Sequence, residues 1–465
     1  MTLAGELARR IVSTRQEDLT PEAIRYAKIG LLDTIGVTLA GSQEQATRIA
    51  DQIAGMETGP SLVFGRGRRT SPLAAAFVNG IAANVLDFDD CTDHLGGHPS
   101  APVLPALLAL GEKLDARGCD VLLAYVVGFE AETQIARGVN FHHYEKGWHA
   151  TATLGVFGAA AAGARLLGLS VDQTTTALAL SASLASGIKS NLGSMAKPLH
   201  VGNCARNGLL AALLAQDGFT ANADAFEHSQ GFLNLFNGPG MYSTERILEK
   251  WGTPFDIAVP GIAIKQYPCC LSVQSAIDAM LSLVRAHGIR PEQVTRIDSL
   301  TYARRLEHTN RPAPRSALDA KLSVQYCLAR ALMDRKVVLA QFEGDAYRDP
   351  EAQRIMKLVH AAAFPHGAPS ENDDFAAEIR ITTVDGESYT TGLNRPVGHE
   401  PGIPLSPDLL KQKFEQCATR VLSADQAVRV YALVSNIENL ASINELTAAL
   451  AAQPEPRRER ARAAR

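Results

Sequence analysis

The stretch ATLGVFGAAAAGARLLGL, residues 152–169, is the most apolar part of the chain and sets the character of the fold. Its apolar residues recur at helical spacing, but Arg165 interrupts the run and four glycines lie within it. A bilayer span needs about 20 consecutive, predominantly apolar residues, so this composition favours a helix buried in protein. Alanine and glycine side chains let neighbouring helices approach closely. We therefore expect a tightly packed helical assembly around this stretch and no membrane segment.

The same helical pattern extends outward from this stretch in both directions. Apolar residues recur at intervals of three or four, and glycine or proline separates the segments. The pair Thr20-Pro21 supplies the N-cap and first-turn proline of the first segment. Helices are predicted over residues 23–40, 73–86, 101–114, 121–136, 151–167, 174–188 and 202–217. The first half of the chain is therefore predicted to be helical.

The pattern changes after about Pro260. Residues 294–302 and 376–383 alternate between apolar and polar side chains, which predicts half-buried strands. Helical patterns return at residues 407–421 and 424–437, and two short helices cannot bury a core alone. The predicted fold is mainly α. It has a large all-helical domain over residues 1–264, completed by residues 397–452, and a smaller α+β domain over residues 265–396.

Composition and charge exclude several classes of function. The 465 residues carry a net charge of −4, which provides no basic field for nucleic acid or an anionic membrane. The basic tail, residues 453–465, begins with a proline-containing stretch and is predicted to be disordered. The seven cysteines lack the spacing of a zinc site, and the N-terminus lacks the pattern of a signal peptide. We expect reduced thiols and a cytoplasmic protein.

The first segment that could carry chemistry is DFDDCTDHLGGHPSAP, residues 87–102. It holds four aspartates, two histidines and a Gly-Gly turn between two apolar helices. Composition alone slightly favours a polar loop whose aspartates cap the next helix, with a catalytic site as the alternative. The spacing of the acids and histidines matches no metal-ligand motif, so a bound metal is not expected.

The second segment, FHHYEKGWHATAT, covers residues 141–153 and leads into the alanine-rich helix. The start of a helix presents free backbone N–H groups that stabilise an anion. His149 lies just before that helix, where an imidazole could exchange a proton with a bound carboxylate. A capped surface turn, with Tyr144 and Trp148 as packing residues, explains the segment equally well.

Two further segments combine small residues with a lysine. Residues 190–203, SNLGSMAKPLHVGN, form a small-residue loop entering an apolar helix that carries Arg206. Lys197 in this loop could act as a base in a dry pocket or bind a carboxylate while charged, although most lysines are simply solvated. Residues 265–272, KQYPCCLS, place Cys269 and Cys270 beside a proline, and adjacent cysteines usually indicate packing.

Taken together, the four segments resemble the MmgE/PrpD family. The family's Leu-Asp-Phe-Asp-Asp run and its His-Pro-Ser element are found at residues 86–90 and 98–100. Its Gly-aromatic-His-x-Thr, Gly-Ser-Met-x-Lys-x-Leu-His and Lys-x-Tyr-Pro-Cys-Cys elements are found at residues 147–151, 193–200 and 265–270. The resemblance covers about residues 7–440. It implies a helical domain, a smaller α+β domain, a cleft between them and a homodimer.

By motif position, the resemblance places the family's active-site residues on particular side chains of this chain. The catalytic set is Asp87, His98, His149 and Lys197, with Tyr144 nearby, and the substrate-binding set is Arg206, His200, Cys270 and Cys91. No metal and no organic cofactor are implied. Cis-aconitate decarboxylases carry a histidine at the position of Cys270 and a threonine at the position of Cys91, so these two residues depart from that branch.

The resemblance also implies the chemistry. Family members act on small di- or tricarboxylates, and each handles a proton at a carbon beside a carboxylate. The leading expectation is a cofactor-free lyase, either a dehydratase or a decarboxylase, acting on a compound such as 2-methylcitrate or cis-aconitate. The alternative is an epimerase of a small dicarboxylate of the iminodisuccinate type, with Lys197 and Tyr144 as two bases. A non-catalytic carboxylate-binding protein is the third possibility.

Overall fold

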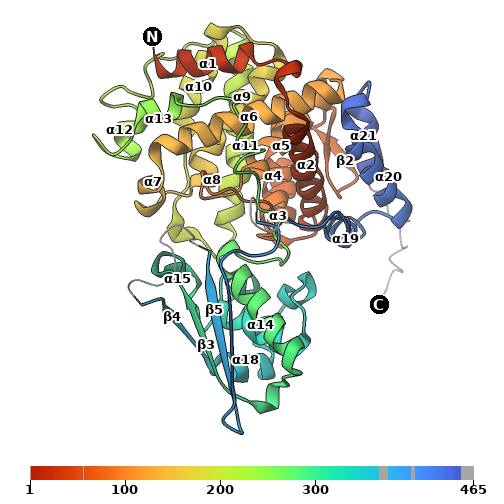
Figure 1. The fold of residues 1–465 in the computed structure, drawn as a ribbon. Coiled ribbons are helices and arrows are strands. Elements are labelled where there is room, and N and C mark those ends of the chain that lie inside the picture. The colour runs from red at the N-terminus through yellow and green to blue at the C-terminus, as the bar shows by residue number, and fades with distance from the viewer. Residues whose placement is uncertain (1, 56, 366–374, 400–403, 452–465) are drawn as a thin grey trace, which may run out of the picture.

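The computed structural model describes residues 2–55, 57–365, 375–399 and 404–451, and shows a large helical body above a smaller α+β part (Figure 1). The predicted disordered tail, residues 453–465, lies outside the described residues. The helical body contains α1 (Leu3–Ser13), α2 (Pro21–Gly41), α3 (Gln45–Ala54), β1 (Ser61–Val63), β2 (Arg68–Thr70), α4 (Pro72–Asn84), α5 (Ser100–Leu114), α6 (Gly118–Val139), α7 (His142–Glu145), α8 (Ala150–Thr153), α9 (Gly155–Leu167), α10 (Val171–Leu184), α11 (Ala196–Gln216), α12 (Phe232–Phe236) and α13 (Thr244–Leu248).

Capping residues and small side chains explain this helical body. The hydroxyl of Thr20 accepts a hydrogen bond from the backbone N–H of Ala23 at 3.1 Å, so α2 begins at Pro21 as predicted. Helices α4 and α11 cross where Gly80 faces Gly202, and a Cβ atom at Gly80 would lie 2.9 Å from the Cα atom of Gly202. The absence of side chains at this crossing therefore permits the close approach expected from the composition.

The apolar stretch of residues 152–169 lies in the core. The structure divides it at Leu154, so α8 and α9 replace the single predicted helix. Residues 150–167 are the one described helical stretch long and apolar enough to cross a membrane, and 83% of it is buried inside the protein. Its apolar surface is therefore covered by the neighbouring helices, among which α6 and α11 pack against α9.

The α+β part is built on a four-stranded sheet with the order β4-β3-β5-β6. Strand β3 pairs parallel to β4 and antiparallel to β5, and β5 pairs antiparallel to β6. Every second residue of β5 is buried, which matches the predicted alternation. The elements are α14 (Gln274–His287), β3 (Val294–Thr301), α15 (Ala303–Thr309), α16 (Ala317–Ala320), α17 (Val324–Asp334), α18 (Pro350–Met356), β4 (Val359–Ala363), β5 (Ala377–Thr383) and β6 (Ser388–Leu393).

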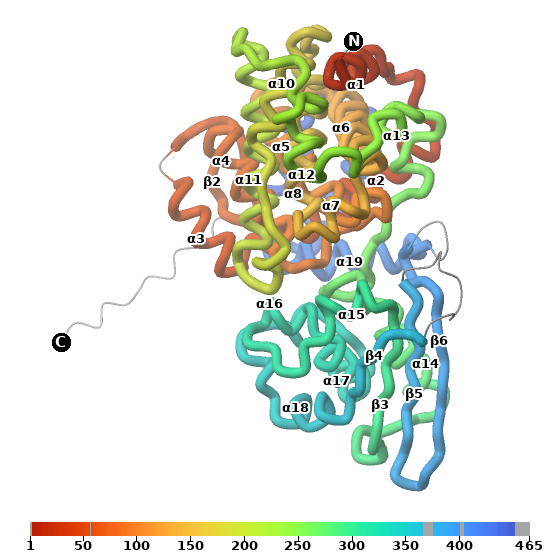
Figure 2. The backbone as a smooth tube through the Cα atoms, turned by 90° about the vertical axis from the view of Figure 1, so that its left-hand side faces the viewer, coloured from red at the N-terminus to blue at the C-terminus, as the bar shows by residue number. Residues whose placement is uncertain are grey.

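The chain returns to the helical body after the sheet, through α19 (Pro407–Ala418), α20 (Ala424–Ser435) and α21 (Asn444–Leu450). Figure 2 shows the α+β part below the helical body, with α19 close to the boundary between them. Leu410 and Phe414 of α19 belong to the same buried core as Leu31 and Ile35 of α2. The predicted mainly α fold, with a large helical part and a smaller α+β part, is thus confirmed.

A buried lysine fixes α19 in place. The Nζ atom of Lys413 lies 2.6 Å from Oδ1 of Asp33 on α2 and donates a hydrogen bond to the carbonyl oxygen of Phe88 at 2.7 Å. Burial raises the pKa of Asp33, although the charge of Lys413 opposes this effect. The contact joins the C-terminal helices to the turn that follows α4.

We predict that Lys413→Met lowers the free energy of unfolding by about 3–5 kcal/mol, because it leaves a buried carboxyl group and a buried carbonyl group without their partner. Urea unfolding measures the change. Lys411→Met is the matched control on the same helix: its half-exposed side chain lies 3.9 Å from Glu415, and a surface pair contributes at most about 1 kcal/mol. Equal losses in the two variants would contradict the proposed importance of the buried contact.

Candidate active site

A cavity lies at the boundary between the helical body and the α+β part. Its empty volume is about 670 Å³, including space that opens to solvent. The helical body contributes Asp87, Cys91, Thr92, Asp93, Gly96, Gly97, His98, Tyr144, His149, Thr151, Leu192 and Lys197. The rest of the lining consists of Lys265, Cys270, Leu271, Ser272, Arg305, His308, Leu322 and Phe375. Three of the four segments singled out in the sequence thus meet the α+β part at one cavity, together with Lys265 and Cys270 of the fourth.

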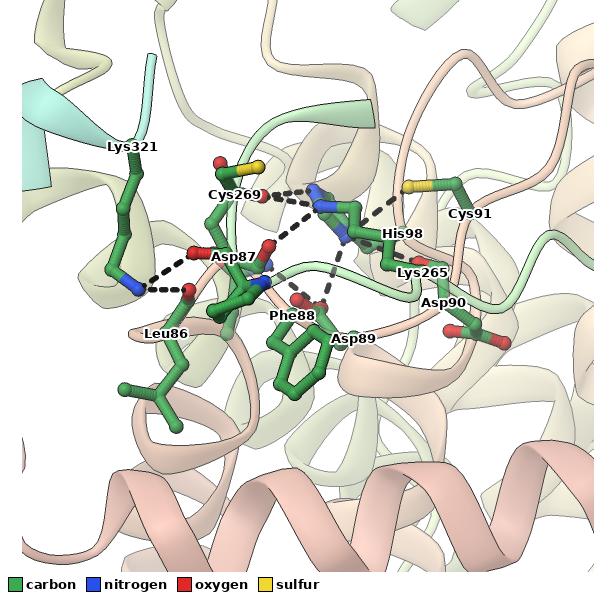
Figure 3. Close-up of polar contacts among 12 residues, drawn as sticks. Leu86, Asp87, Phe88, Asp89, Asp90, Cys91, His98, Lys265, Cys269 and Lys321 are labelled. Atoms are coloured by element: carbon green, nitrogen blue, oxygen red, sulfur yellow. Dashed lines mark hydrogen bonds and ion pairs between the residues drawn. The ribbon is translucent and has the colours of Figure 1, made fainter. Parts of the chain in front are cut away.

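The turn after α4 is held by three buried lysines, each of which donates to one of three consecutive carbonyl groups. Lys321 reaches Leu86 at 2.7 Å, Lys265 reaches Asp87 at 2.9 Å, and Lys413 reaches Phe88 at 2.7 Å. Figure 3 shows Lys265 and Lys321 converging on this turn. Asp87 has a φ of 51°, in the left-handed region that is uncommon for residues other than glycine. The lysines therefore fix a turn that the backbone does not favour by itself.

The side chain of Asp87 is the centre of the charged network. Its Oδ1 atom lies 2.6 Å from Nζ of Lys265, 2.9 Å from Nζ of Lys197 and 3.5 Å from Nε2 of His98. Burial alone would raise the pKa of Asp87, but the charges of Lys197 and Lys265 outweigh that effect and hold it well below its usual range. Asp87 is therefore a carboxylate that orients two ammonium groups.

His98 is fixed from both sides. Its Nδ1 atom lies 3.1 Å from Oδ2 of Asp89 and 3.1 Å from the carbonyl oxygen of Asp90. Two oxygen acceptors on this side place the ring proton on Nδ1. The Nε2 lone pair then faces Nζ of Lys197 at 3.5 Å. Burial lowers the pKa of His98, so a neutral imidazole accepts from Lys197.

His149 precedes α8 and is paired with His200. The two Nδ1 atoms are 3.2 Å apart, and burial, together with the charge of Lys197, lowers the pKa of His149 well below its usual range. His200 is not part of the cavity lining, so its link to the cavity runs through His149. Both imidazoles are neutral at neutral pH, and the pair fixes the orientation of the His149 ring.

Tyr144 lies on α7, beside the anchoring residue His143. The imidazole of His143 lies 2.9 Å from Oδ1 of Asn237 and 2.7 Å from Oγ1 of Thr153, and its ring stacks on Trp148. Burial lowers the pKa of His143 to about 4 and raises the pKa of Tyr144 to about 12. Tyr144 therefore presents a protonated phenol to the cavity.

The α+β wall of the cavity adds polar groups that the sequence did not single out. Arg305 and His308 lie three residues apart on α15, and the hydroxyl of Ser272 lies 3.1 Å from Nε2 of His308. Burial and the charge of Arg305 lower the pKa of His308 to about 3. This wall therefore offers a guanidinium, a hydroxyl and a neutral imidazole.

The two cysteines expected at the site line the cavity as neutral thiols. Sγ of Cys91 lies 3.6 Å from Nδ1 of His98, and the backbone of Cys91 pairs with Ala263. Burial raises the pKa of both Cys91 and Cys270. Neither thiol is therefore activated as a nucleophile.

Arg206 was expected to bind substrate, but the structure places it away from the cavity. It is exposed and lies with its guanidinium carbon 5.8 Å from the ring centre of Phe77. Helix α11 begins at Ala196, not at residue 202 as predicted, so Lys197 is in its first turn. Nine residues of helix then separate Lys197 from Arg206 by about 13 Å. The cavity-lining arginine among the described residues is Arg305.

Lys265 and Asp89 were also missed as functional residues. Lys265 had a signal, because it opens the fourth segment, but a lysine buried to 1% exposure could not be inferred from its neighbours in sequence. Asp89 belongs to the first segment and is fully buried against His98. Arg305 and His308 had no signal in the sequence, since they lie in a segment with an ordinary mixture of polar residues.

Asp87, Asp89 and His98 offer ligand atoms within 4.8 Å of one another, a spacing that suits a metal ion. However, the ammonium groups of Lys197 and Lys265 already contact Asp87 on the same oxygen atom. A divalent cation at this place would meet two positive charges within contact distance of its ligand. The donor set therefore fits an ion-paired network better than a metal site.

Two family models match the chain. The MmgE/PrpD N-terminal domain matches residues 5–245, and the MmgE/PrpD C-terminal domain matches residues 267–439. The chain is 31% identical over 464 residues to the human cis-aconitate decarboxylase, with 97% of this chain and 94% of the relative covered. It is 32% identical to the mouse cis-aconitate decarboxylase, at 96% and 93% coverage, and 28% identical to that of Aspergillus terreus, at 96% and 95% coverage.

The buried imidazole of His143 predicts a measurable dependence of stability on pH. In the unfolded chain a histidine has the ordinary pKa of 6.5, whereas burial lowers the pKa of His143 to about 4 in the folded protein. The unfolded state binds more protons between these values, so His143 makes the free energy of unfolding fall as the pH falls. The contribution is up to about 1.4 kcal/mol per pH unit.

We therefore expect His143→Gln to have a smaller slope of unfolding free energy against pH than the wild type between pH 6 and pH 4.5. The difference between the proteins isolates His143 from buried acids such as Glu130, whose pKa is raised by burial to about 8 and whose effect has the opposite sign. His228→Gln, at an exposed position, is the control. Identical slopes for wild type and His143→Gln would refute the assignment.

Proposed function

Because the chain belongs to the MmgE/PrpD family, we propose that it is a lyase that removes carbon dioxide from a small tricarboxylate of the cis-aconitate type. The names of its full-length relatives support this reaction. The observation that carries the proposal is the contact of Lys197 with both Asp87 and His98 at the wall of the cavity. This contact supports a proton donor and cationic carboxylate binders side by side in one cavity.

Decarboxylation of such a substrate needs bound carboxylates and one delivered proton. When carbon dioxide leaves a carbon next to the double bond, the electron pair of the broken C–C bond shifts that double bond. A carbon beside a remaining carboxylate then takes up a proton. A trianion and one proton thereby become a dianion and carbon dioxide. The step uses groups that the chain itself supplies, so we propose that it needs no organic cofactor.

Lys197 is the proposed proton donor. Its ammonium lines the cavity, with Asp87 Oδ1 at 2.9 Å and the Nε2 lone pair of His98 at 3.5 Å. The ion pair with Asp87 and the contact with the neutral His98 orient Lys197. His149 lines the cavity as a neutral imidazole and is proposed to donate a hydrogen bond to a substrate carboxylate. Lys265 is ion-paired with Asp87 and is proposed to influence Lys197 through this carboxylate.

A second candidate is the epimerisation of a small dicarboxylate of the iminodisuccinate type. The observation that favours it is that Tyr144 and Lys197 both line the cavity from different helices. One group could remove a proton from a carbon beside a carboxylate while the other returns a proton. With a pKa of about 12, the phenol of Tyr144 is protonated at neutral pH and suits the donating role.

The remaining expectations are part of the same proposal. We propose a homodimer, as the family resemblance implies, and a cytoplasmic location, which the free cysteines support. A dehydratase is the third form of the reaction: the site would then remove a proton and expel water.

We expect purified protein incubated with cis-aconitate in D₂O to release one carbon dioxide and place one deuterium in the product for each substrate consumed, as measured by gas analysis and NMR. Prior dialysis against EDTA should leave the rate unchanged. Deuterium in unchanged substrate or its stereoisomer, without carbon dioxide, would contradict the lyase. Loss of the rate after dialysis, restored by a divalent cation, would contradict the metal-free step.

We further expect Lys197→Ala to lower kcat by about a hundredfold or more, because a positioned proton donor contributes this much. His149→Ala should lower it about tenfold to a hundredfold, because it removes a hydrogen bond to a charged group. Carbon dioxide release measures kcat, and thermal unfolding checks that the variants are folded. Lys250→Ala, at an exposed position outside the cavity, is the control. Full turnover in the Lys197 variant would show that the proton comes from another group.

A further inference from the structure

Arg305 lines the cavity but has no role in the proposed proton transfer. It lies on α15, which follows β3 directly, and lines the cavity opposite the catalytic segments of the helical body. Its guanidinium carbon lies 4.1 Å from the ring centre of Phe375, which also lines the cavity. Stacking on this ring restricts the planar guanidinium and lowers the entropy cost of binding an anion.

Arg305 and its neighbour Arg304 make different contacts, and of these two arginines Arg305 alone lines the cavity. Arg304 precedes Arg305 on the same helix, but its guanidinium lies 4.4 Å from the ring centre of Phe141 and 3.8 Å from Glu145. Arg304 does not line the cavity. Of two consecutive arginines, α15 therefore presents one to the substrate space and uses the other to contact α7.

Positively charged side chains line the cavity on both walls. Around the turn that carries Asp87, Lys197 and Lys265 both contact the same oxygen of Asp87. One of their two positive charges is therefore balanced within the network. Asp93, the other cavity-lining carboxylate among the described residues, lies 3.0 Å from His399 and 3.6 Å from Arg395. The positive charge of Arg305 thus adds a second cationic region on the far wall.

We propose that Arg305 binds a second carboxylate of the substrate, one that remains in the product, while the reacting carbon faces Lys197. The inference rests on the proposed function, because it takes the substrate to be a polycarboxylate. The Ser272–His308 pair, with its oxygen and nitrogen 3.1 Å apart, lies on the same wall and supplies a polar surface beside this carboxylate. Arg305 is therefore a specificity-determining residue.

Binding of a carboxylate by Arg305 determines which carboxylate of the substrate can leave. A guanidinium stabilises a carboxylate through charge-assisted hydrogen bonds, and this stabilisation opposes the loss of that carboxylate as neutral carbon dioxide. The departing carboxylate must then lie away from Arg305. A monocarboxylate can occupy only one of the two regions, so the site discriminates against monocarboxylates.

Binding of unreactive acids to the full-length protein tests the proposal without relying on turnover. Isothermal titration calorimetry would compare propane-1,2,3-tricarboxylate, succinate and butyrate on the wild type, Arg305→Gln, Arg305→Lys and the matched control Arg304→Gln. We expect Arg305→Gln to weaken binding of the tricarboxylate and of succinate about tenfold to a hundredfold. Butyrate binding should stay unchanged. The affinity of Arg305→Lys for the two polycarboxylates should lie between those of the wild type and Arg305→Gln, and Arg304→Gln should bind them as tightly as the wild type.

An error in the role of Arg305 and an error in the proposed function give different binding results. If the wild type binds none of the polycarboxylates, the proposed substrate class is wrong. If the wild type binds them and Arg305→Gln binds them equally well, only the role of Arg305 is wrong. Equal weakening of succinate and butyrate in Arg305→Gln would also overturn the proposal, because it indicates a general disturbance of the cavity. Unchanged butyrate binding in that variant shows that it is folded.

Discussion

The contact on which the site depends is that of three buried lysines with three consecutive carbonyl groups, at residues 86–88. Burying an ammonium group is costly unless it is paired and hydrogen-bonded, and here each lysine finds a carbonyl oxygen. Lys321 and Lys265 come from the region leading into and through the α+β part, whereas Lys413 comes from α19. The turn that carries Asp87 is therefore defined only when the helical body, the α+β part and the C-terminal helices are assembled around it.

This dependence extends to the charged network around the turn. Once the turn is fixed, Asp87 holds Lys197, and Lys197 faces the Nε2 atom of His98. The opposite side of the His98 ring is fixed by Asp89 and by the carbonyl group of Asp90. Each group restricts the next, so the protonation state of the network follows from its geometry: a carboxylate, two ammonium groups and a neutral imidazole.

Local signals predicted the helices well and the sheet only in part. Thr20-Pro21 and the small residues of α9 act within a few positions, so their effects can be inferred from the sequence. Strand β4 was missed because its Ala361–Ala363 run favours helix, and its place in the sheet depends on pairing with the distant strand β3, as in Ile297 with Val359. Strand β6 had a usable signal, the Asp385-Gly386 turn before it, where Gly386 has a φ of 86°. In the site, the acidic segment and Lys197 were evident, but Arg305 lies on a wall that only tertiary folding brings into place.

The two sides of the cavity carry different chemical groups. The helical body contributes Asp87, His98, Tyr144 and Lys197 to the cavity, whereas Cys270, Ser272, Arg305 and His308 form the opposing surface. Cys270 supplies the thiol of this surface. The thiol here has a pKa raised by burial and does not exchange protons at neutral pH, and His308, with a pKa of about 3, stays neutral. In the proposed reaction, proton transfer therefore falls to Lys197 and the phenol of Tyr144, and selection of the acid falls to the opposing wall.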